Sequence, residues 1–395
     1  MRIAVYGGSF NPPHLGHLNS AIAAAKQLKP DRFLVIPGHQ PPHKTMEAGS
    51  PSPEERLELC RKCFADVPNA EVSDIEIRRG GKSYTADTVE ALQRLYPGAE
   101  LYLLMGTDML LDLGRWYRAE FIMQNVIVAP FQRDTDELVY IEAKAEELRS
   151  RFGAKVEIIN SRPFPAASSD IRQLLRQRQG VELLSETVYA CIIRKRLYGA
   201  KVSLPWLREK AYAMLKPNRV AHVRGCEQEA VALAKRWGAD PEDAAEAAIL
   251  HDCTKKARLQ EQLSLCASYG VRPDALERRN EKLLHAKTGA ALAQAEFGVS
   301  DAVAEAIRWH TTGKPEMTLA EKIIYMADYI EPNRDFEGVD KLRELAYKDL
   351  DRAMLLGLEM SIEENRRYGN EIHKNSLAAR DWFQKLVNKK EEASV

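Results

Sequence analysis

The chain has 395 residues, a length typical of two or three domains. Its 57 Lys and Arg balance its 57 Asp and Glu, so neither nucleic acid nor an anionic membrane surface is expected as a general partner. The composition, with 45% hydrophobic and 29% charged residues, is that of a folded globular protein and excludes global disorder.

The N-terminal segment MRIAVYGGSFNPPH lacks the long apolar core and cleavage site of a secretory signal. No apolar run approaches the roughly 18 residues that a membrane span needs. The six cysteines are too few and too scattered for a disulfide framework, so we expect a cytoplasmic protein. Cys60 and Cys63 form a single CxxC, and without a second CxxC to complete a zinc site we interpret them as helix-face residues.

Short β-rich runs alternate with helical patterns as far as about residue 160. Helices are expected at 17–29, after the first strand, and at 52–67. Near-continuous apolar strands separated by helices indicate a parallel sheet covered on both faces, with ligands bound beyond the carboxyl ends of its strands. The predicted strands are 2–6, 32–37, 72–77, 100–106, 125–131 and 155–160.

The β pattern disappears after about residue 198, and 199–205 reads as a linker. From residue 205 onward the pattern is helical almost to the C-terminus. We therefore predict an α/β domain over 1–200 and an all-α domain over 201–395. The clearest helical segments of the second domain are 218–238, 241–259, 300–313 and 319–332.

The loop after the first strand begins with Gly7 and Gly8 and places His14 and His17 where a helix starts. Glycines allow close approach of a ligand, and a helix start offers free N–H groups to an anion, so the loop predicts a phosphate site. A Gly/Pro turn carrying two surface histidines is the alternative. The loop lacks GxGxxG, and Gly81-Lys82-Ser83 is not a Walker A motif because Glu76 occupies the position of its leading glycine.

The string GGSFNPPHLGH resembles the signature of the nucleotidyltransferase family, and specifically of bacterial nicotinate mononucleotide adenylyltransferases. This resemblance implies a Rossmann-like fold. A later segment resembles the family's second phosphate motif, SSTxIR, with Asp170 in place of Thr; a plain helix cap is the alternative. The other matching segments are 41–44, 83–88, 106–108 and 116–117.

The resemblance implies transfer of AMP from ATP to nicotinate mononucleotide, with Mg²⁺ bound to the triphosphate. A substrate phosphate can attack the α-phosphorus of ATP directly when both are held in line. Under this hypothesis His14 and His17 stabilise the developing charge, while Lys44 and Arg172 hold the triphosphate. Asp108 orients the nucleotide, and Thr85, Trp116 and Tyr117 form the nicotinate pocket, although core packing is an alternative for Trp116. The remaining implied binding residues are Gly7, Gly8, Ser9, Phe10, Asn11, Gly106, Ser168, Ser169 and Ile171.

The helical half contains an ordered set of histidines and aspartates that resembles the HD phosphohydrolase superfamily. Over about 204–383 it is similar to the HD-domain symmetrical diadenosine tetraphosphate hydrolases, with Glu337 where that family often has Pro. Nitrogen and oxygen ligands suit iron or manganese, and the resemblance implies two metal ions, most simply iron, bridged by Asp252. Lys255 follows the HD pair as a phosphate ligand or a solvated helix end, and His373 stays unassigned. The implied ligands are His222, His251, Asp252, His285, His310 and Asp328.

Together these observations predict a bifunctional enzyme that makes nicotinate adenine dinucleotide and splits diadenosine tetraphosphate into two ADP. Two alternatives stay open. The first domain can have another phosphate acceptor, such as phosphopantetheine or a cytidylyltransferase substrate. The helical domain can be a metal-dependent sensor that binds a nucleotide and regulates its neighbour without turnover, or it can hydrolyse another nucleotide.

Overall fold

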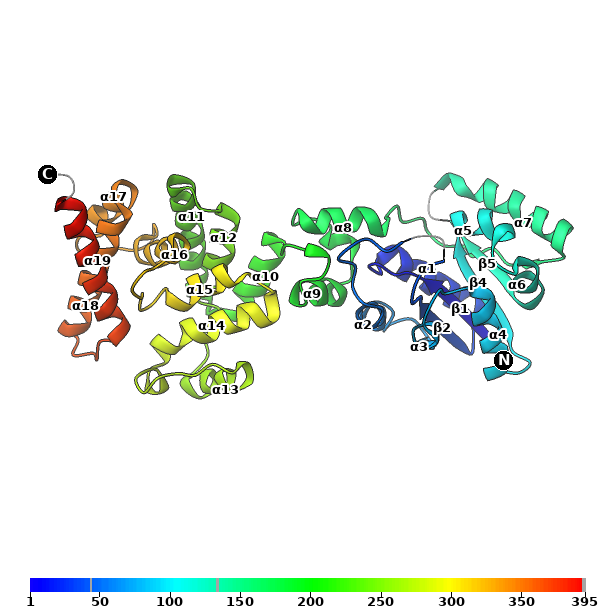
Figure 1. Ribbon diagram of the computed structural model, residues 1–395, viewed down its shortest axis with the longest axis horizontal. Helices are drawn as coiled ribbons and strands as arrows, with labels where there is room; N and C mark the ends of the chain where they lie inside the picture. The colour runs from blue at the N-terminus through cyan, green and yellow to red at the C-terminus, as the bar shows by residue number, and fades with distance from the viewer. Residues whose placement is uncertain (43–44, 133–134, 393–395) are drawn as a thin grey trace. The chain divides into compact units, whose positions relative to one another are not determined.

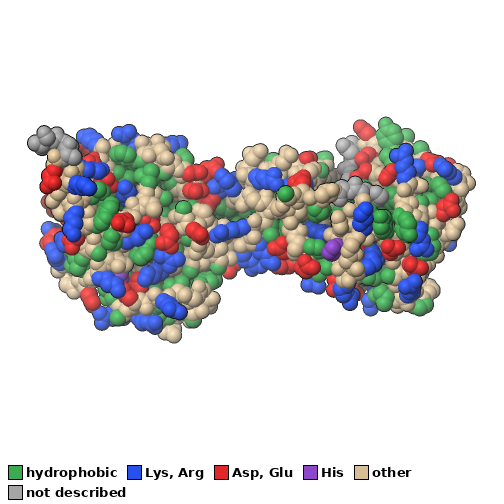
Figure 2. Space-filling model, in the orientation of Figure 1, with side chains coloured by type: hydrophobic (Ala, Val, Ile, Leu, Met, Phe, Trp, Pro, Cys, Tyr) green, Lys and Arg blue, Asp and Glu red, His purple; other side chains and the backbone are tan. Residues whose placement is uncertain are grey.

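The computed structural model describes residues 1–42, 45–132 and 135–392. The chain divides into two compact units, Met1–Lys201 and Val202–Val395 (Figure 1). Lys, Arg, Asp and Glu side chains are interspersed over the face drawn in Figure 2, as the balanced charge of the sequence leads one to expect. No described helix is long and apolar enough to cross a membrane.

The first unit is built on one parallel sheet of six strands in the order β3-β2-β1-β4-β5-β6. Strand β1 lies between β2 and β4, so the loops that follow β1 and β4 open side by side at the carboxyl edge of the sheet. The strands are β1 Arg2–Gly8, β2 Arg32–Pro37, β3 Ala70–Val72, β4 Glu100–Gly106, β5 Ile127–Phe131 and β6 Lys155–Val156.

Both faces of the sheet are buried. Ile3 and Val5 of β1 belong to a core formed with the helices that follow β3 and β4, while Ala4 and Tyr6, which point to the opposite face, are buried as well. This two-sided burial explains why the strands read as continuous apolar runs. The helices of this unit are α1 Leu15–Leu28, α2 Pro53–Cys63, α3 Ile75–Arg79, α4 Thr85–Leu95, α5 Thr107–Asp112, α6 Ala119–Asn125, α7 Leu138–Phe152, α8 Ser168–Arg176 and α9 Glu186–Arg194.

Two predicted strands are wrong in extent. The predicted strand 72–77 ends at Val72, and its second half is the short helix α3. The apolar alternation suggested a strand, but Ser73 bonds the N–H of Ile75 and starts a turn, and the Glu76 carboxylate is buried against the Thr88 hydroxyl. The predicted strand 155–160 stops at Val156, with only an isolated bridge between Phe131 and Ile159 beyond it.

The second unit is helical throughout its described residues, so the prediction of a Rossmann-like α/β domain followed by an all-α domain is confirmed. Alanines at 244, 245, 247 and 248 are buried, which allows close approach of neighbouring helices. Helix α12 ends at Leu250, earlier than predicted, and 251–256 forms turns. The helices are α10 Leu204–Met214, α11 Val220–Trp237, α12 Pro241–Leu250, α13 Leu259–Tyr269, α14 Glu281–Phe297, α15 Asp301–Trp309, α16 Leu319–Ile330, α17 Val339–Lys348, α18 Leu350–Arg367 and α19 Lys374–Glu392.

Candidate functional sites

The two histidines of the first loop fix each other where α1 begins. The Gly16 N–H donates to His14 Nδ1 at 3.2 Å, and the His14 N–H donates to His17 Nδ1 at 3.2 Å. A ring nitrogen that accepts a hydrogen bond carries no proton, so each neutral imidazole has its proton on Nε2. The ring centroids are 3.7 Å apart. The capping hydrogen bonds therefore fix the orientation of both rings and leave their two Nε2–H groups as a pair of donors.

A pocket of about 570 Å³ lies at the carboxyl edge of the sheet. It brings together residues from both ends of the first unit's sequence. Ile171 does not line it and is buried in the interior, and Lys44 lies outside the described residues. The predicted residues that line the pocket are Gly7, Gly8, Ser9, Phe10, Asn11, His14, His17, Thr85, Gly106, Asp108, Trp116, Tyr117, Ser168, Ser169 and Arg172.

The second phosphate motif is tied to the first loop. Arg172 donates from Nη1 to the Asn11 carbonyl at 2.7 Å, and its Nε and Nη2 bind the Glu47 carboxylate. Glu47, which sequence reasoning missed, thus occupies the guanidinium fork that was predicted to hold phosphate. The plain helix cap considered as the alternative for the serines is not formed: the N-cap of α8 is Ala167, and the Ser168 hydroxyl donates to the Pro12 carbonyl at 3.0 Å.

A buried arginine that sequence reasoning missed supports the same loop. Arg56 of α2 is 1% exposed. Its guanidinium donates to the carbonyls of Ser9 and Gly38 at 2.7 Å and of His39 at 3.0 Å. Burial lowers the pKa of this arginine. Three carbonyls from two separate loops converge on one side chain, which fixes the loop after β1 against the end of β2. In sequence, Arg56 looked like an ordinary polar residue of an amphipathic helix.

The other end of the pocket is aromatic. The rings of Tyr84 and Tyr117 lie with centroids 4.9 Å apart, and Thr85 begins α4 beside them. Trp116 both lines the pocket and packs against the sheet core, so the two roles considered for it are compatible. Glu76 also lines the pocket, where burial raises its pKa while the Thr88 hydroxyl donates to it at 2.6 Å.

In the second unit, the six implied metal ligands lie on five helices or directly after them: α11, α12, α14, α15 and α16. These helices are labelled in Figure 1. His222 Nε2 lies 3.0 Å from Asp328 Oδ1 and 3.4 Å from His251 Nε2. His285 Nε2 lies 3.1 Å from both Asp252 Oδ1 and His310 Nε2. All six are buried except Asp328, whose side chain is 16% exposed.

The orientation of these rings fits a metal centre. The Nδ1 atoms of His251 and His310 face the carbonyls of Ala248 and Ile307 at 2.6 and 2.7 Å. A carbonyl only accepts hydrogen bonds, so Nδ1 carries the proton and the Nε2 lone pair of each neutral ring faces the cluster. Lone pairs that meet at about 3 Å repel one another unless a cation lies among them. Buried nitrogen and oxygen donors of this kind fit a pair of divalent ions of the iron or manganese type.

The pKa values of two rings, His285 and His310, agree with metal ligation. Burial lowers the pKa of His285 to about 4 and also lowers that of His310, so both rings are neutral and available as ligands at neutral pH. Burial acts in the same direction on His251, but the adjacent Asp252 carboxylate outweighs it and raises the pKa of that ring.

Three cations surround the carboxylates of the cluster. Arg219 donates from Nε to Asp252 Oδ2 at 2.6 Å, and Lys255 donates to Asp252 Oδ1 at 3.0 Å. Arg334 donates to Asp328 Oδ1 at 2.8 Å. The three side chains are 26%, 34% and 33% exposed, so each also reaches solvent. Sequence reasoning identified Lys255 as a phosphate candidate but missed both arginines, whose positions become visible only when the helices pack.

His373, unassigned from sequence, belongs to a structural cluster. Its Nδ1 accepts from the Asn375 N–H at 3.1 Å, so its Nε2 carries the proton and faces Asp274 Oδ2 at 2.9 Å. Glu277 beside it pairs with Lys287 at 2.7 Å. These contacts tie the start of α19 to the segment before α14.

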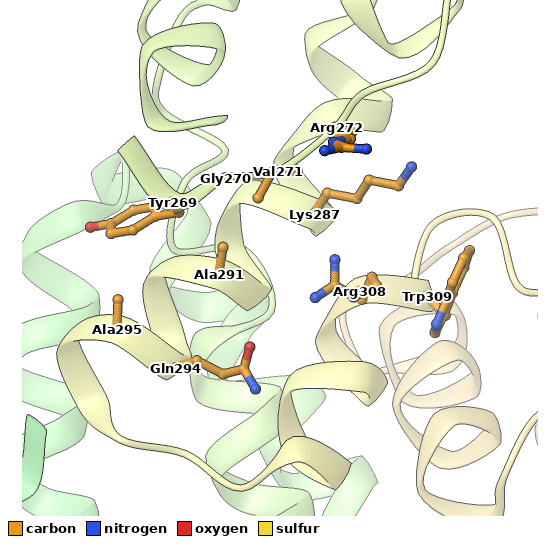
Figure 3. A pocket seen from close by; sticks show the side chains of 10 residues that line it. All are labelled: Tyr269, Gly270, Val271, Arg272, Lys287, Ala291, Gln294, Ala295, Arg308 and Trp309. Carbon is orange, nitrogen blue, oxygen red and sulfur yellow. The ribbon is translucent and has the colours of Figure 1, made fainter. Parts of the chain in front are cut away.

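A second pocket, of about 460 Å³, lies between the end of α13, α14 and α15 (Figure 3). Lys287 and Arg308 face it, but Glu277 and Glu305 pair with these two cations. None of the predicted site residues lines it. Its members are Tyr269, Gly270, Val271, Arg272, Lys287, Ala291, Gln294, Ala295, Arg308 and Trp309.

Comparison with known proteins gives two families. Residues 5–174 match the cytidylyltransferase-like family and residues 219–333 match the HD domain. The chain is 34% identical over 201 residues to a probable nicotinate-nucleotide adenylyltransferase of Caldicellulosiruptor saccharolyticus, an alignment that covers 50% of this chain and 99% of the relative. It is 39% identical over 181 residues to a symmetrical bis(5'-nucleosyl)-tetraphosphatase of Bacillus subtilis, covering 45% of this chain and 97% of the relative.

A solved structure from Clostridium acetobutylicum, described as a predicted HD superfamily hydrolase involved in NAD metabolism, is 37% identical. The match covers 46% of this chain and 96% of that one, with a TM-score of 0.45.

Proposed function

We propose that this one chain catalyses two reactions on adenine nucleotides, because its first half belongs to the nicotinate-nucleotide adenylyltransferase family and its second half to the HD-domain symmetrical tetraphosphatase family. The first unit transfers AMP from ATP to nicotinate mononucleotide and releases pyrophosphate. The second unit hydrolyses diadenosine tetraphosphate to two ADP.

The pocket that joins the histidine loop to the aromatic end is the observation that carries the first activity. ATP enters with Mg²⁺ on its phosphates. The Nε2–H groups of His14 and His17 donate to the phosphate oxygens as charge shifts from the α-phosphorus to the departing pyrophosphate. Arg172 exchanges Glu47 for a phosphate oxygen, and Lys44 is proposed to bind the same triphosphate.

Acceptor recognition is assigned to the aromatic end of the pocket. Trp116 and Tyr117 provide stacking area for the pyridine ring. Thr85, where α4 begins, offers its hydroxyl to the acceptor carboxylate, and Asp108 orients the nucleotide. A site that hydrogen-bonds the substrate in this way discriminates strongly against an analogue lacking the bonding group.

The test of the first activity is an acceptor screen with Mg·ATP. Purified protein is incubated with nicotinate mononucleotide, nicotinamide mononucleotide or phosphopantetheine, and dinucleotide and pyrophosphate are quantified by chromatography. The proposal expects product with nicotinate mononucleotide above the other two. Product with phosphopantetheine alone contradicts it and favours the other acceptor class.

The six converging ligands and the cations around them carry the second activity. Two bound metal ions supply activation of a water molecule and neutralisation of the phosphate under attack. Asp252 offers one oxygen to each half of the cluster. Arg219, Lys255 and Arg334 exchange their carboxylate partners for the oxygens of the polyphosphate chain and hold it in place.

The test of the second activity is product analysis with anaerobically purified full chain, supplied with iron or manganese. The proposal expects two ADP for each diadenosine tetraphosphate consumed, and elemental analysis should give close to two metal ions per chain. Nucleotide binding without release of ADP contradicts the proposal and favours a regulatory module.

A further inference from the structure

The six metal ligands form two unequal groups around the two oxygens of Asp252. Its Oδ2 lies 3.4 Å from His251 Nε2 and 3.8 Å from His222 Nε2. Asp328 belongs to the same group, with its Oδ1 3.0 Å from His222 Nε2. Its Oδ1 lies 3.1 Å from His285 Nε2 and 3.8 Å from His310 Nε2. One position therefore has four protein ligands and the other three.

A buried carboxylate outside the ligand set orients His222. Glu331, which directly follows α16, is 1% exposed, and its Oε1 lies 3.1 Å from His222 Nδ1. Its Oε2 accepts from the Asn333 backbone N–H and from Asn333 Nδ2, both at 2.8 Å. The carboxylate is thus held from one side and accepts the imidazole N–H on the other, so the His222 Nε2 lone pair faces Asp252 and Asp328.

The neighbouring helix leaves space for this carboxylate. Gly225 lies on α11, three residues after His222 and on the same helix face. A Cβ at this position would lie 2.2 Å from Glu331 Oε2 and 2.9 Å from Asn333 Nδ2. Burial of a carboxylate costs free energy that an apolar residue would not incur. Both the cost and the matching glycine suggest a role for Glu331 other than packing.

The second position lacks an equivalent support. The Nδ1 atom of His285 is buried and has no hydrogen-bond partner among the described residues. His310 of the second position relies on a backbone carbonyl, as His251 of the first position does, and a carbonyl is a weaker acceptor than the Glu331 carboxylate behind His222. Ligand number and ligand orientation therefore both favour tighter metal binding at the position that contains His222.

We propose that Glu331 is a positioning residue that fixes His222 as a metal ligand, and that the position formed by His222, His251, Asp252 and Asp328 binds its ion more tightly than the position beside His285 and His310. This inference rests on the metal centre of the proposed function, but not on the identity of the nucleotide that is hydrolysed.

The test is a titration of the metal-free full chain with Mn²⁺, in which electron paramagnetic resonance measures the free ion. The wild-type chain is expected to bind two ions with distinct affinities. Glu331→Gln and Glu331→Ala should weaken the tighter site by about 10- to 100-fold and leave the weaker site within a few-fold of wild type. Asn333→Ala, which removes one donor to Glu331, should cause a smaller loss at the same site.

The matched control is Glu277→Gln, because Glu277 is also a buried carboxylate of this unit, 2% exposed, but contacts Lys287 and the His373 cluster. Its Mn²⁺ affinities should equal those of wild type. Two equal sites in the wild-type chain overturn the proposal, as do folded Glu331 variants with unchanged affinities. If the Glu331→Ala protein does not fold, the Mn²⁺ affinity of the tighter site in Asn333→Ala decides whether the proposal holds. Normal Mn²⁺ binding without diadenosine tetraphosphate hydrolysis removes only the proposed substrate.

Discussion

At the scale of single residues, the first site depends on which nitrogen of each imidazole carries the proton. The backbone N–H of His14 donates to His17 Nδ1, and the backbone N–H of Gly16 donates to His14 Nδ1. The sequence indicated two histidines at a helix start, but the tautomer follows from the reciprocal bonds, which only coordinates show. Both rings are donors in the ground state and need no protonation to bind phosphate.

His17→Ala removes one of these donors. We expect the turnover of adenylyl transfer to fall by about 10²- to 10³-fold, because a donor aimed at developing charge acts mainly in the transition state. Steady-state kinetics with ATP and nicotinate mononucleotide measure the change. His251→Ala in the other unit is the control and should leave this rate unchanged. Near-normal turnover of a folded His17→Ala protein contradicts the assigned role.

Arg56→Met tests the support of the loop. Loss of the guanidinium leaves the carbonyls of Ser9, Gly38 and His39 without their donor, so we expect the free energy of unfolding of the first unit to fall by about 2–4 kcal/mol. Urea denaturation measures it. Arg61→Met, at an exposed position on the same helix, should change stability by less than about 0.5 kcal/mol. Equal effects of the two substitutions would exclude the positioning role.

At the scale of elements, one carboxylate links the last helix to two others. Asp351 of α18 accepts from Lys322 of α16 at 2.9 Å and pairs with Lys390 of α19. Burial raises the pKa of Asp351, but hydrogen bonds from the two lysines outweigh burial, and the pKa lies below its usual value. The ion pairs therefore stabilise the folded state above the unfolded pKa of about 3.9 and lose their effect as the pH falls through the lower folded pKa.

Asp351→Asn should accordingly lower stability by about 1 kcal/mol at pH 7, because the lysines are partly solvated. The difference from wild type should disappear as the pH falls below the lowered pKa of Asp351 in the folded state. Thermal unfolding of both proteins across this range measures it. A difference that stays constant with pH would show that the loss arises from packing and not from charge.

Element boundaries also mark the limit of sequence reasoning. Strands β1, β2 and β4 were predicted closely because burial on both faces leaves a continuous apolar run that little else resembles. The segment 72–77 was predicted wrongly because a period of two over six residues does not distinguish a strand from a short helix. In the structure Glu76 of α3 accepts a hydrogen bond from Thr88, twelve residues away, and no local pattern reports such a contact.

At the scale of the whole molecule, each unit has its own core and its own site. We expect His251→Ala to abolish hydrolysis of diadenosine tetraphosphate and to preserve adenylyl transfer. Chelation of the metal ions should do the same once Mg²⁺ is restored for ATP, and should lower the melting temperature of the second unit, because an ion that binds only the folded state stabilises it. Parallel assays and calorimetry check this. Loss of both activities in His251→Ala would require coupling between the sites.

The sequence by itself determined the two fold classes, since the change from period-two strands to uninterrupted helices is a local property that survives without tertiary knowledge. It also indicated the chemistry, because spaced histidines, glycines and aspartates are visible as residue types. Only the tertiary structure decided the partners: Glu47 in the fork of Arg172, Arg56 beneath the loop, and Glu331 behind His222. These contacts join residues 47 to 125 positions apart, and no periodicity reports such distances, because packing and not local propensity brings the side chains together.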